Sequence, residues 1–364
     1  MHELVLILDF GSQYTQLIAR RIREEQVYCR IVRSDLSATE IQSMGAKALV
    51  LSGGPNSIFE KHAPQVDPAI FELGIPILGV CYGLQIMTQH FKGNVIPGET
   101  REYGPMGIQF PTQSPLFEGV SEGSQVWMSH GDHVETIPEN FNIIARSSGD
   151  LIAGISHQSK LFYGVQFHPE VNHTVQGQTI ISNFLFKIAA FNRDWTSSSF
   201  VEDAIKQIRS TVGDGKVLLG LSGGVDSSVL AFLMHDAIGE NCVPVFINNG
   251  LLRQNETEEV KSLFEASHVK IYQHDYTDAF LSELAGVVEP EKKRKIIGRV
   301  FIEAFEEVAR EIKGIDFLAQ GTLYPDVIES GAITGHAVTI KSHHNVGGLP
   351  EKMSLKVIEP FKEL

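Results

Sequence analysis

Short apolar runs that end at a turn alternate with longer amphipathic segments along most of this chain. Residues 4–8, 48–51 and 76–80 are such runs, and each has the length of a buried strand. Helical spacing follows them, as in residues 13–25. Repeats of strand and helix are typical of a parallel sheet with helices on both faces. Because the alternation restarts at residues 217–221, the chain is predicted to be an α/β protein with two parallel-sheet α/β domains.

The first domain is expected to carry an antiparallel extension beside its parallel sheet. Within residues 126–167, turns separate the four strand-like runs VWMSH, FNIIARSS, LIAGIS and LFYGVQF, and helical spacing over 177–191 ends the domain. The polar segment 192–199 (NRDWTSSS) then predicts a linker. The predicted domains are residues 1–192 and residues 200–364.

The second domain is expected to begin with a helix near Phe200. After the strand 217–221, the pattern predicts a helix over 227–238, a strand over 243–247, a helix over 256–266 and a strand over 269–273. Neither domain contains an internal repeat or a low-complexity segment, so neither is expected to be a solenoid.

Composition narrows the possible functions. The 364 residues include 43% hydrophobic and 20% charged residues, which excludes a disordered or collagen-like chain. The formal net charge of −14 makes nucleic acids and anionic membranes poor partners. Three scattered cysteines form no C-x-x-C pair and no disulfide framework. Without a signal peptide or a spanning apolar run, a cytoplasmic protein is expected.

The first candidate site is a cysteine between two glycines. Gly79-Val80-Cys81-Tyr82-Gly83 follows a buried strand and precedes helical spacing over 84–91. The flanking glycines allow the sharp turn that presents a nucleophile above a sheet. A thiol at a helix N-terminus is favoured as the thiolate. A lone cysteine is also commonly a small buried apolar residue, so this motif alone leaves both interpretations open.

Two further motifs supply the partners that such a nucleophile needs. In His168-Pro169-Glu170 the proline favours extended backbone, in which residues two apart face the same side. The imidazole is thus predicted to reach the thiol, with the carboxylate behind it. Gly53 and Gly54 end another strand, and their N–H groups are predicted to stabilise an oxyanion together with the N–H of Tyr82. A satisfied histidine and a plain Gly-Pro turn are the alternatives.

These segments together resemble the class I glutamine amidotransferases. The resemblance rests on SGGP at 52–55, GVCYGLQ at 79–85, WMSHGD at 127–132 and GVQFHPE at 164–170. It implies that Cys81 attacks the side-chain amide of glutamine, that His168 protonates the departing ammonia and that water then releases glutamate. It also implies that Gln85, Ser129 and His130 hold the glutamine.

The second candidate site is a glycine- and serine-rich loop between a strand and a helix. Such a loop presents N–H groups and hydroxyls to phosphates. It is not a Walker A loop, because it lacks the G-K-[ST] ending. The seven residues 222–228 (SGGVDSS) resemble the pyrophosphate loop of the ATP pyrophosphatases. The resemblance implies ATP as a substrate and a need for Mg²⁺. Asp226 is a candidate metal ligand or simply a helix cap. The predicted ATP-binding residues are Ser222, Gly223, Gly224, Val225, Asp226, Ser227 and Ser228.

The whole chain resembles the glutamine-hydrolysing GMP synthase family. The resemblance extends to KRKIIGR, YPDVIES and KSHHNVGGLP, and it implies roles in binding substrate or phosphate for Arg299, Asp326 and Lys341. The basic cluster 292–295 is more simply a solvated helix face. The family's reaction implies glutamine, ATP and XMP as substrates, with adenylylation of XMP before ammonia displaces AMP to give GMP. No nucleic acid and no membrane are expected as partners.

Two departures from this family keep other hypotheses open. Asn248 stands where the family has an aspartate, and the chain ends where the family's C-terminal dimerisation domain should begin. The resemblance therefore implies a family homodimer that forms through a domain absent from this chain. One alternative is an amidotransferase that acts on another adenylylated acceptor. The other is a truncated or degenerate copy with a binding or regulatory role.

Overall fold

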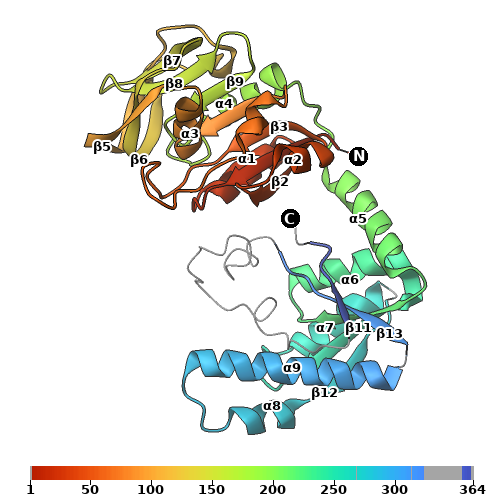
Figure 1. The fold of residues 1–364 in the computed structure, drawn as a ribbon. Helices are drawn as coiled ribbons and strands as arrows, with labels where there is room; N and C mark the ends of the chain where they lie inside the picture. Colours follow the sequence, from red (N-terminus) through yellow and green to blue (C-terminus); the bar gives the residue numbers. More distant parts are fainter. Residues whose placement is uncertain (1, 268, 313, 324–354, 362–364) are drawn as a thin grey trace. The chain divides into compact units, whose positions relative to one another are not determined.

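The chain divides into two compact units, Met1–Thr196 and Ser197–Leu364. The computed structural model describes residues 2–267, 269–312, 314–323 and 355–361, and Figure 1 draws the fold. Each unit contains a sheet with helices, the first sheet largely parallel and the second parallel throughout. The predicted fold class is therefore confirmed. No helix of the described residues is long and apolar enough to cross a membrane.

The first unit is built on a nine-stranded sheet with the order β2-β1-β3-β4-β9-β8-β7-β5-β6. The strands from β2 to β9 in that order run parallel, and the remaining pairs are antiparallel, as the sequence predicts. The strands are β1 (Leu4–Asp9), β2 (Tyr28–Arg33), β3 (Ala46–Leu51), β4 (Ile77–Val80), β5 (Asn94–Gln109), β6 (Gln125–Thr136), β7 (Phe141–Ser147), β8 (Ile152–His157) and β9 (Phe162–Val165).

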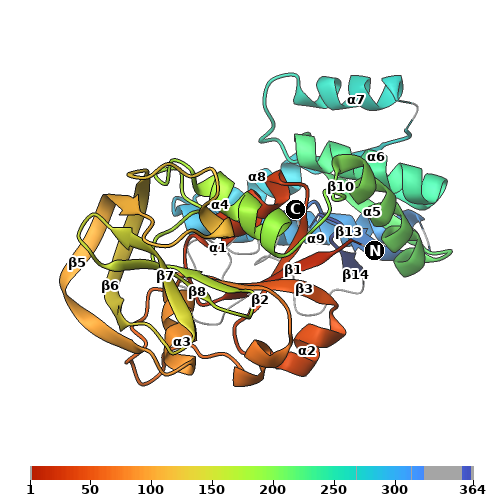
Figure 2. The ribbon, with the colours of Figure 1, turned by 90° about the horizontal axis from the view of Figure 1, so that it is seen from above.

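Helices cover both faces of this sheet, and Figure 2 shows α1 and α4 on one face and α2 and α3 on the other. Alternate residues along β1 explain this, because Val5 and Ile7 pack in one core cluster while Leu6 and Leu8 pack in the other. The helical elements are α1 (Thr15–Glu24), α2 (Ala38–Ser43), η1 (Pro68–Glu72), α3 (Tyr82–His90), η2 (Pro115–Phe117), α4 (Gly177–Asn183) and the π-helix η3 (Phe184–Ile188).

The second unit has a five-stranded parallel sheet with the order β12-β11-β10-β13-β14. Val217 and Leu219 of β10 share a core cluster with α5 and α6, whereas Leu218 packs with residues of α8 and α9 on the other face. The elements are α5 (Ser197–Val212), β10 (Lys216–Leu221), α6 (Val225–Ile238), η4 (Gly239–Asn241), β11 (Cys242–Asn248), α7 (Glu256–Ala266), β12 (Tyr272–Asp275), α8 (Thr277–Leu284), α9 (Pro290–Ile312), β13 (Ile315–Ala319) and β14 (Lys356–Ile358).

The structure corrects three of the predicted element bounds. The helix expected over 177–191 is a short α-helix followed by a π-helix that ends at Ile188. The linker expected through residue 199 ends earlier, because α5 already begins at Ser197. The strand expected over 269–273 is β12, which begins three residues later, at Tyr272, where pairing with Val245 of β11 begins.

Candidate functional site

The carboxyl ends of four neighbouring parallel strands open into one cavity in the first unit. Residues that follow β1, β3, β4 and β9 line it, together with part of β6, and its volume is about 530 Å³. Tyr14, Gly54, Cys81 and His168 are among the residues at its wall. Parallel sheets commonly bind ligands at this edge, because the loops after neighbouring strands converge there.

The cysteine is presented by a sharp turn that needs both of its flanking glycines. Cys81 caps the N-terminus of α3 with a φ of +49°, which is outside the ordinary range for a side-chain-bearing residue. A Cβ on Gly79 would lie 2.7 Å from the backbone of Gly83, and a Cβ on Gly83 would lie 2.3 Å from the carbonyl oxygen of Leu51. The elbow geometry that the motif predicts is therefore present.

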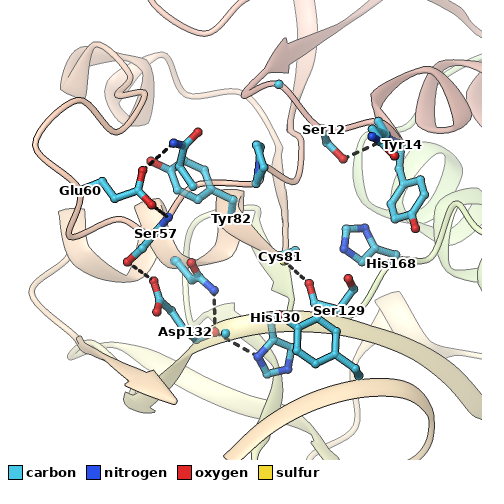
Figure 3. Close-up of a pocket in the computed structure, with 18 residues that line it drawn as sticks. Ser12, Tyr14, Ser57, Glu60, Cys81, Tyr82, Ser129, His130, Asp132 and His168 are labelled. Carbon is cyan, nitrogen blue, oxygen red and sulfur yellow. Dashed lines mark hydrogen bonds between the residues drawn. The ribbon is translucent and has the colours of Figure 1, made fainter. Parts of the chain in front are cut away.

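His168 and Glu170 meet beside this cysteine. The imidazole Nδ1 lies 2.7 Å from Glu170 Oε1, and the His168 and Glu170 side chains are buried. Figure 3 shows the His168 ring on one side of Cys81, next to Tyr14. His168 follows a bend after β9, and a turn that includes Glu170 brings the two side chains together, so they do not lie along one extended segment. Thr174 Oγ1 stabilises this turn by donating a hydrogen bond to the His168 carbonyl at 2.6 Å.

The surroundings of His168 favour its charged form. Burial by itself lowers the pKa of this imidazole, but the Glu170 carboxylate and a hydrogen bond with Cys81 outweigh burial and raise the pKa well above 6.5. A cationic imidazole beside the sulfur favours the thiolate, which is the nucleophilic form of cysteine. Glu170 also holds the tautomer, because its carboxylate faces Nδ1 and leaves Nε2 for the opposite side.

Backbone N–H groups for an oxyanion lie at the same wall. Tyr82 is the first residue of α3, a position whose N–H has no partner within the helix. Gly54 lines the cavity and packs on the Tyr82 ring, which is 3.2 Å from where a Cβ would be. Gly53 is not among the lining residues. It lies against His168, whose Cε1 would be 2.9 Å from a Cβ at this position, so a side chain here would displace the imidazole.

The other predicted glutamine-binding residues surround the far side of the cavity. Gln85 Nε2 donates to the Asp132 carbonyl at 2.8 Å, and His130 Nδ1 lies 3.0 Å from the same oxygen. Burial lowers the pKa of His130 to about 4, so this imidazole is neutral near pH 7. The carbonyl oxygen of Ser129 lies 3.9 Å from Cys81 Sγ and accepts a hydrogen bond from the thiol.

The structure adds two carboxylates that the sequence analysis did not assign. Asp132 Oδ2 accepts a hydrogen bond from Ser57 Oγ at 2.6 Å, and Glu60 Oε1 accepts one from the Ser57 N–H at 3.3 Å. Both acidic residues line the cavity, on the side away from His168 in Figure 3. Asp132 ends the WMSHGD motif, so an acidic residue next to Ser129 and His130 could have been predicted as part of the glutamine site. Glu60 lies in an irregular loop where no pattern marks it.

In the second unit, the predicted phosphate loop joins β10 to α6. Gly224 caps the helix, and Gly223 has a φ of +78°, which requires glycine. The hydroxyls of Ser227 and Ser228 both donate to the Gly224 carbonyl, at 3.1 and 2.9 Å. These two serines shape the loop from inside, while Ser222, Val225 and Asp226 are exposed. The loop therefore leads into a helix N-terminus, whose first-turn N–H groups have no partner within the helix, and this suits an anion.

Of the other residues predicted to bind substrate or phosphate in the second unit, the structure describes only Arg299. Arg299 is on α9, where its guanidinium pairs with Glu303 and Glu283 at 2.9 Å each. Asp326 and Lys341 lie outside the described residues. The basic cluster 292–295 is exposed on α9, as the solvated-face interpretation expects.

Asn248 ends β11, at the same sheet edge as the loop. Its Nδ2 donates to Asp275 Oδ2 at 3.1 Å, and its Oδ1 accepts the N–H of Gly250 at 3.0 Å. The amide thus bridges the ends of β11 and β12 with both of its polar atoms bonded. A carboxylate at this position would lose the donor and face Asp275 with a like charge.

Comparisons with known proteins follow the same division of the chain. The family model "Glutamine amidotransferase class-I" matches residues 6–188, and the model "NAD synthase" matches residues 197–296. The second match agrees with the ATP pyrophosphatase resemblance of the loop.

Curated relatives match the chain from end to end. A protein of Maridesulfovibrio salexigens named GMP synthase [glutamine-hydrolyzing] is 50% identical over 363 residues, which are 99% of this chain and 70% of the relative. Proteins of the same name from Wolinella succinogenes and Bacillus cereus are 51% and 50% identical, each over 100% of this chain and 71% of the relative. A solved structure from Thermoplasma acidophilum, described as part of a putative GMP synthase, is 31% identical with a TM-score of 0.48, covering 52% of this chain and 95% of that one.

Proposed function

This chain belongs to the family of glutamine-hydrolysing GMP synthases, and from that premise we propose that Cys81, His168 and Glu170 release the ammonia that the second unit uses. The chain is a ligase that forms the C–N bond of GMP, with glutamine as the nitrogen source. The observation that supports the assignment of residues is the buried His168–Glu170 pair beside Cys81, where Cys81 and His168 line a cavity large enough for an amino acid.

The proposed hydrolysis follows from the groups around the cysteine. The Cys81 thiolate attacks the side-chain carbonyl carbon of glutamine, and the oxygen that becomes negative is stabilised by the N–H groups of Gly54 and Tyr82. The His168 imidazolium gives its proton to the departing nitrogen, which leaves as ammonia. The neutral imidazole then takes a proton from water, and the resulting hydroxide cleaves the thioester to give glutamate and free thiol. Glu170 stabilises the imidazolium in both steps.

The far wall of the cavity suits the other end of glutamine. The α-ammonium of the substrate needs acceptors, and Asp132 and Glu60 offer carboxylates there. Gln85 and His130 act through the Asp132 backbone, because both contact its carbonyl oxygen. Ser129 bounds the cavity next to the sulfur. We propose that this wall selects an amino acid over a simple amide.

In the second unit we propose that the loop Ser222–Ser228 holds the phosphates of ATP during adenylylation of XMP. A bound Mg²⁺ would neutralise the pyrophosphate that leaves. Among the described residues no group of three or more His, Cys, Asp or Glu side chains could hold a metal on its own. Mg²⁺ is commonly held by one or two carboxylates together with substrate phosphates, so the exposed Asp226 beside the loop fits this use.

The homodimer and the cytoplasmic location expected from the sequence stay predictions. The chain spans about 70% of the length of the curated relatives, and the homodimer expected of the family is not tested. The cytoplasmic location stays an expectation from the sequence. An acceptor other than XMP would be recognised by ATP–pyrophosphate exchange that depends on that acceptor and not on XMP.

Replacement of the cysteine tests the proposed hydrolysis. Cys81→Ala is expected to lower glutamine hydrolysis by at least about 10⁴-fold, because the nucleophile is lost, while ATP–pyrophosphate exchange with XMP is unchanged. Glutamate release and exchange are measured on the same preparation, with Cys242→Ala as the matched control, since that cysteine is buried in the second unit. Equal glutamate release from the Cys81→Ala variant would contradict the assignment, and loss of both activities would point to a structural role.

A further inference from the structure

The sulfur of Cys81 has one polar neighbour that the hydrolysis described above does not use. Gln166 follows β9 and is 1% exposed, and its Nε2 lies 3.6 Å from Cys81 Sγ. The backbone fixes this approach, because the Cys81 N–H donates to the Val165 carbonyl at 2.8 Å and the Gln166 N–H donates to the Ala153 carbonyl at 2.9 Å. The side chain is thus held at the sulfur by the sheet itself.

The other end of this amide is left without a partner. Gln166 Oε1 is buried and accepts no hydrogen bond among the described residues. A buried amide oxygen without a donor destabilises the fold, and an apolar side chain of similar size would avoid that loss. A purely structural role would therefore favour leucine or methionine. The amide donor instead lies at the sulfur of Cys81, which indicates a role for the N–H there.

Hydrogen bonds around the sulfur differ for its two protonation states. The thiol can donate to the Ser129 carbonyl, which lies 3.9 Å away. The thiolate has no proton to donate and needs donors, which are Gln166 Nε2 on one side and the His168 ring on the other. The amide of Gln166 is a neutral donor that does not take up a proton. It can therefore stabilise the thiolate while the His168 imidazolium keeps the proton that it later gives to the leaving nitrogen.

We propose that Gln166 is a catalytic residue of the glutamine site, whose amide N–H donates to the Cys81 thiolate and stabilises it as the nucleophile. The proposal rests on the proposed function of Cys81 as the nucleophile. Because Gln166 touches sulfur and is not among the residues that line the cavity, its loss should change kcat and leave KM for glutamine unchanged.

The test measures thiol reactivity directly and does not need turnover. Alkylation by iodoacetamide is followed against pH in the full chain, with the modified peptide identified by mass. The other two cysteines do not interfere, because Cys29 is fully buried and burial raises the pKa of Cys242 to about 12. Gln166→Met keeps the volume and removes the donor. We expect the pH midpoint of alkylation to rise by about one unit, which makes the reaction at lower pH about tenfold slower.

Glutaminase kinetics of the same variant give the second readout. We expect kcat to fall about 10- to 100-fold with KM unchanged. Gln158→Met is the matched control, since Gln158 is an exposed glutamine whose amide donates to Asn142 Oδ1 outside the cavity, and it should behave as the native chain. If Gln166→Met does not fold, Gln166→Leu makes the same measurement, with an upward shift of similar size because leucine also lacks the donor.

Each outcome decides one claim. An unchanged alkylation midpoint in the folded Gln166→Met variant overturns the role of Gln166. A lowered midpoint also overturns it, because it would mean that Oε1 faces the sulfur in the native chain and favours the thiol. Native protein that alkylates at Cys81 with a low midpoint but hydrolyses no glutamine would contradict the proposed function, and a shifted midpoint in Gln166→Met would then show a hydrogen bond to the sulfur without a part in catalysis.

Discussion

Cys81 and Gln166 are in contact at the first site, but the sequence marks only the cysteine as a candidate site residue. The sharp turn at Cys81 could be predicted from the sequence, because two glycines flank a cysteine after an apolar run, but the motif alone left open whether the cysteine is a nucleophile or a small buried apolar residue. Gln166 could not be predicted, since a glutamine between a strand and a histidine carries no pattern of its own. Its contact with Cys81 depends on β4 and β9 being neighbours in the sheet, although 85 residues separate the two side chains.

The charged state of His168 predicts how stability depends on pH. Glu170 raises the pKa of His168 in the folded chain above its unfolded value of about 6.5, against the effect of burial. The stability that this pair contributes is therefore fully present below pH 6.5 and is lost as the pH rises through the folded pKa. Glu170→Gln removes the carboxylate, which contributes most to raising this pKa.

Calorimetry of the native chain and Glu170→Gln across a pH series measures this. The difference in Tm is expected to be largest near pH 6 and to narrow at higher pH. A difference that widens with rising pH would show that the pair is not an imidazolium with a carboxylate. The exposed pair Lys206–Asp203 supplies the control, since removal of a surface pair should change Tm little at any of these pH values.

At the scale of elements, unbroken apolar runs such as residues 4–8 were predicted as strands, and so were runs with a few polar residues such as 141–148. β5 was missed, because glycines and prolines interrupt NVIPGETREYGPMGIQ and only its pairing with β6 makes it a strand. β2 was missed because the arginines in YCRIVR break the apolar run. The meeting of His168 and Glu170 was predicted for the wrong geometry, since a turn after β9 brings them together.

Packing of α4 on that turn gives a prediction at this scale. A Cβ on Gly177 would lie 1.9 Å from the Pro169 carbonyl oxygen, which is backbone between the two site residues. Helix propensity alone favours alanine over glycine by about 1 kcal/mol. Overpacking of this kind destabilises by about 1–3 kcal/mol or more, so the clash outweighs propensity. Gly177→Ala is expected to lower the free energy of unfolding and also glutaminase activity.

Denaturant unfolding and glutaminase assays check this together. Gly131→Ala is the stability control, because nothing lies within 4 Å of a Cβ there. Its free energy of unfolding should stay within about 0.5 kcal/mol of the native value. Equal or greater stability of Gly177→Ala would mean that α4 can move away from the turn without loss.

At the scale of the whole molecule, charge and chemistry point in opposite directions. A chain with a net charge of −14 repels anionic nucleotides, so their binding must depend on local groups such as the open N–H groups at the start of α6. The presence of two sites in one chain also has a chemical reason. Free ammonia in water is protonated and loses its nucleophilic electron pair, so release near its acceptor preserves it.

The proposed function requires that nitrogen from glutamine hydrolysed at Cys81 becomes the amino group of GMP. This transfer is tested by supplying glutamine labelled with ¹⁵N in the amide, together with XMP, ATP, Mg²⁺ and unlabelled ammonium, and measuring ¹⁵N in the nucleotide by mass spectrometry. We expect labelled GMP from the native chain and only unlabelled GMP from Cys81→Ala. Glutamate released from the native chain while GMP is unlabelled, or is not formed at all, would contradict the transfer.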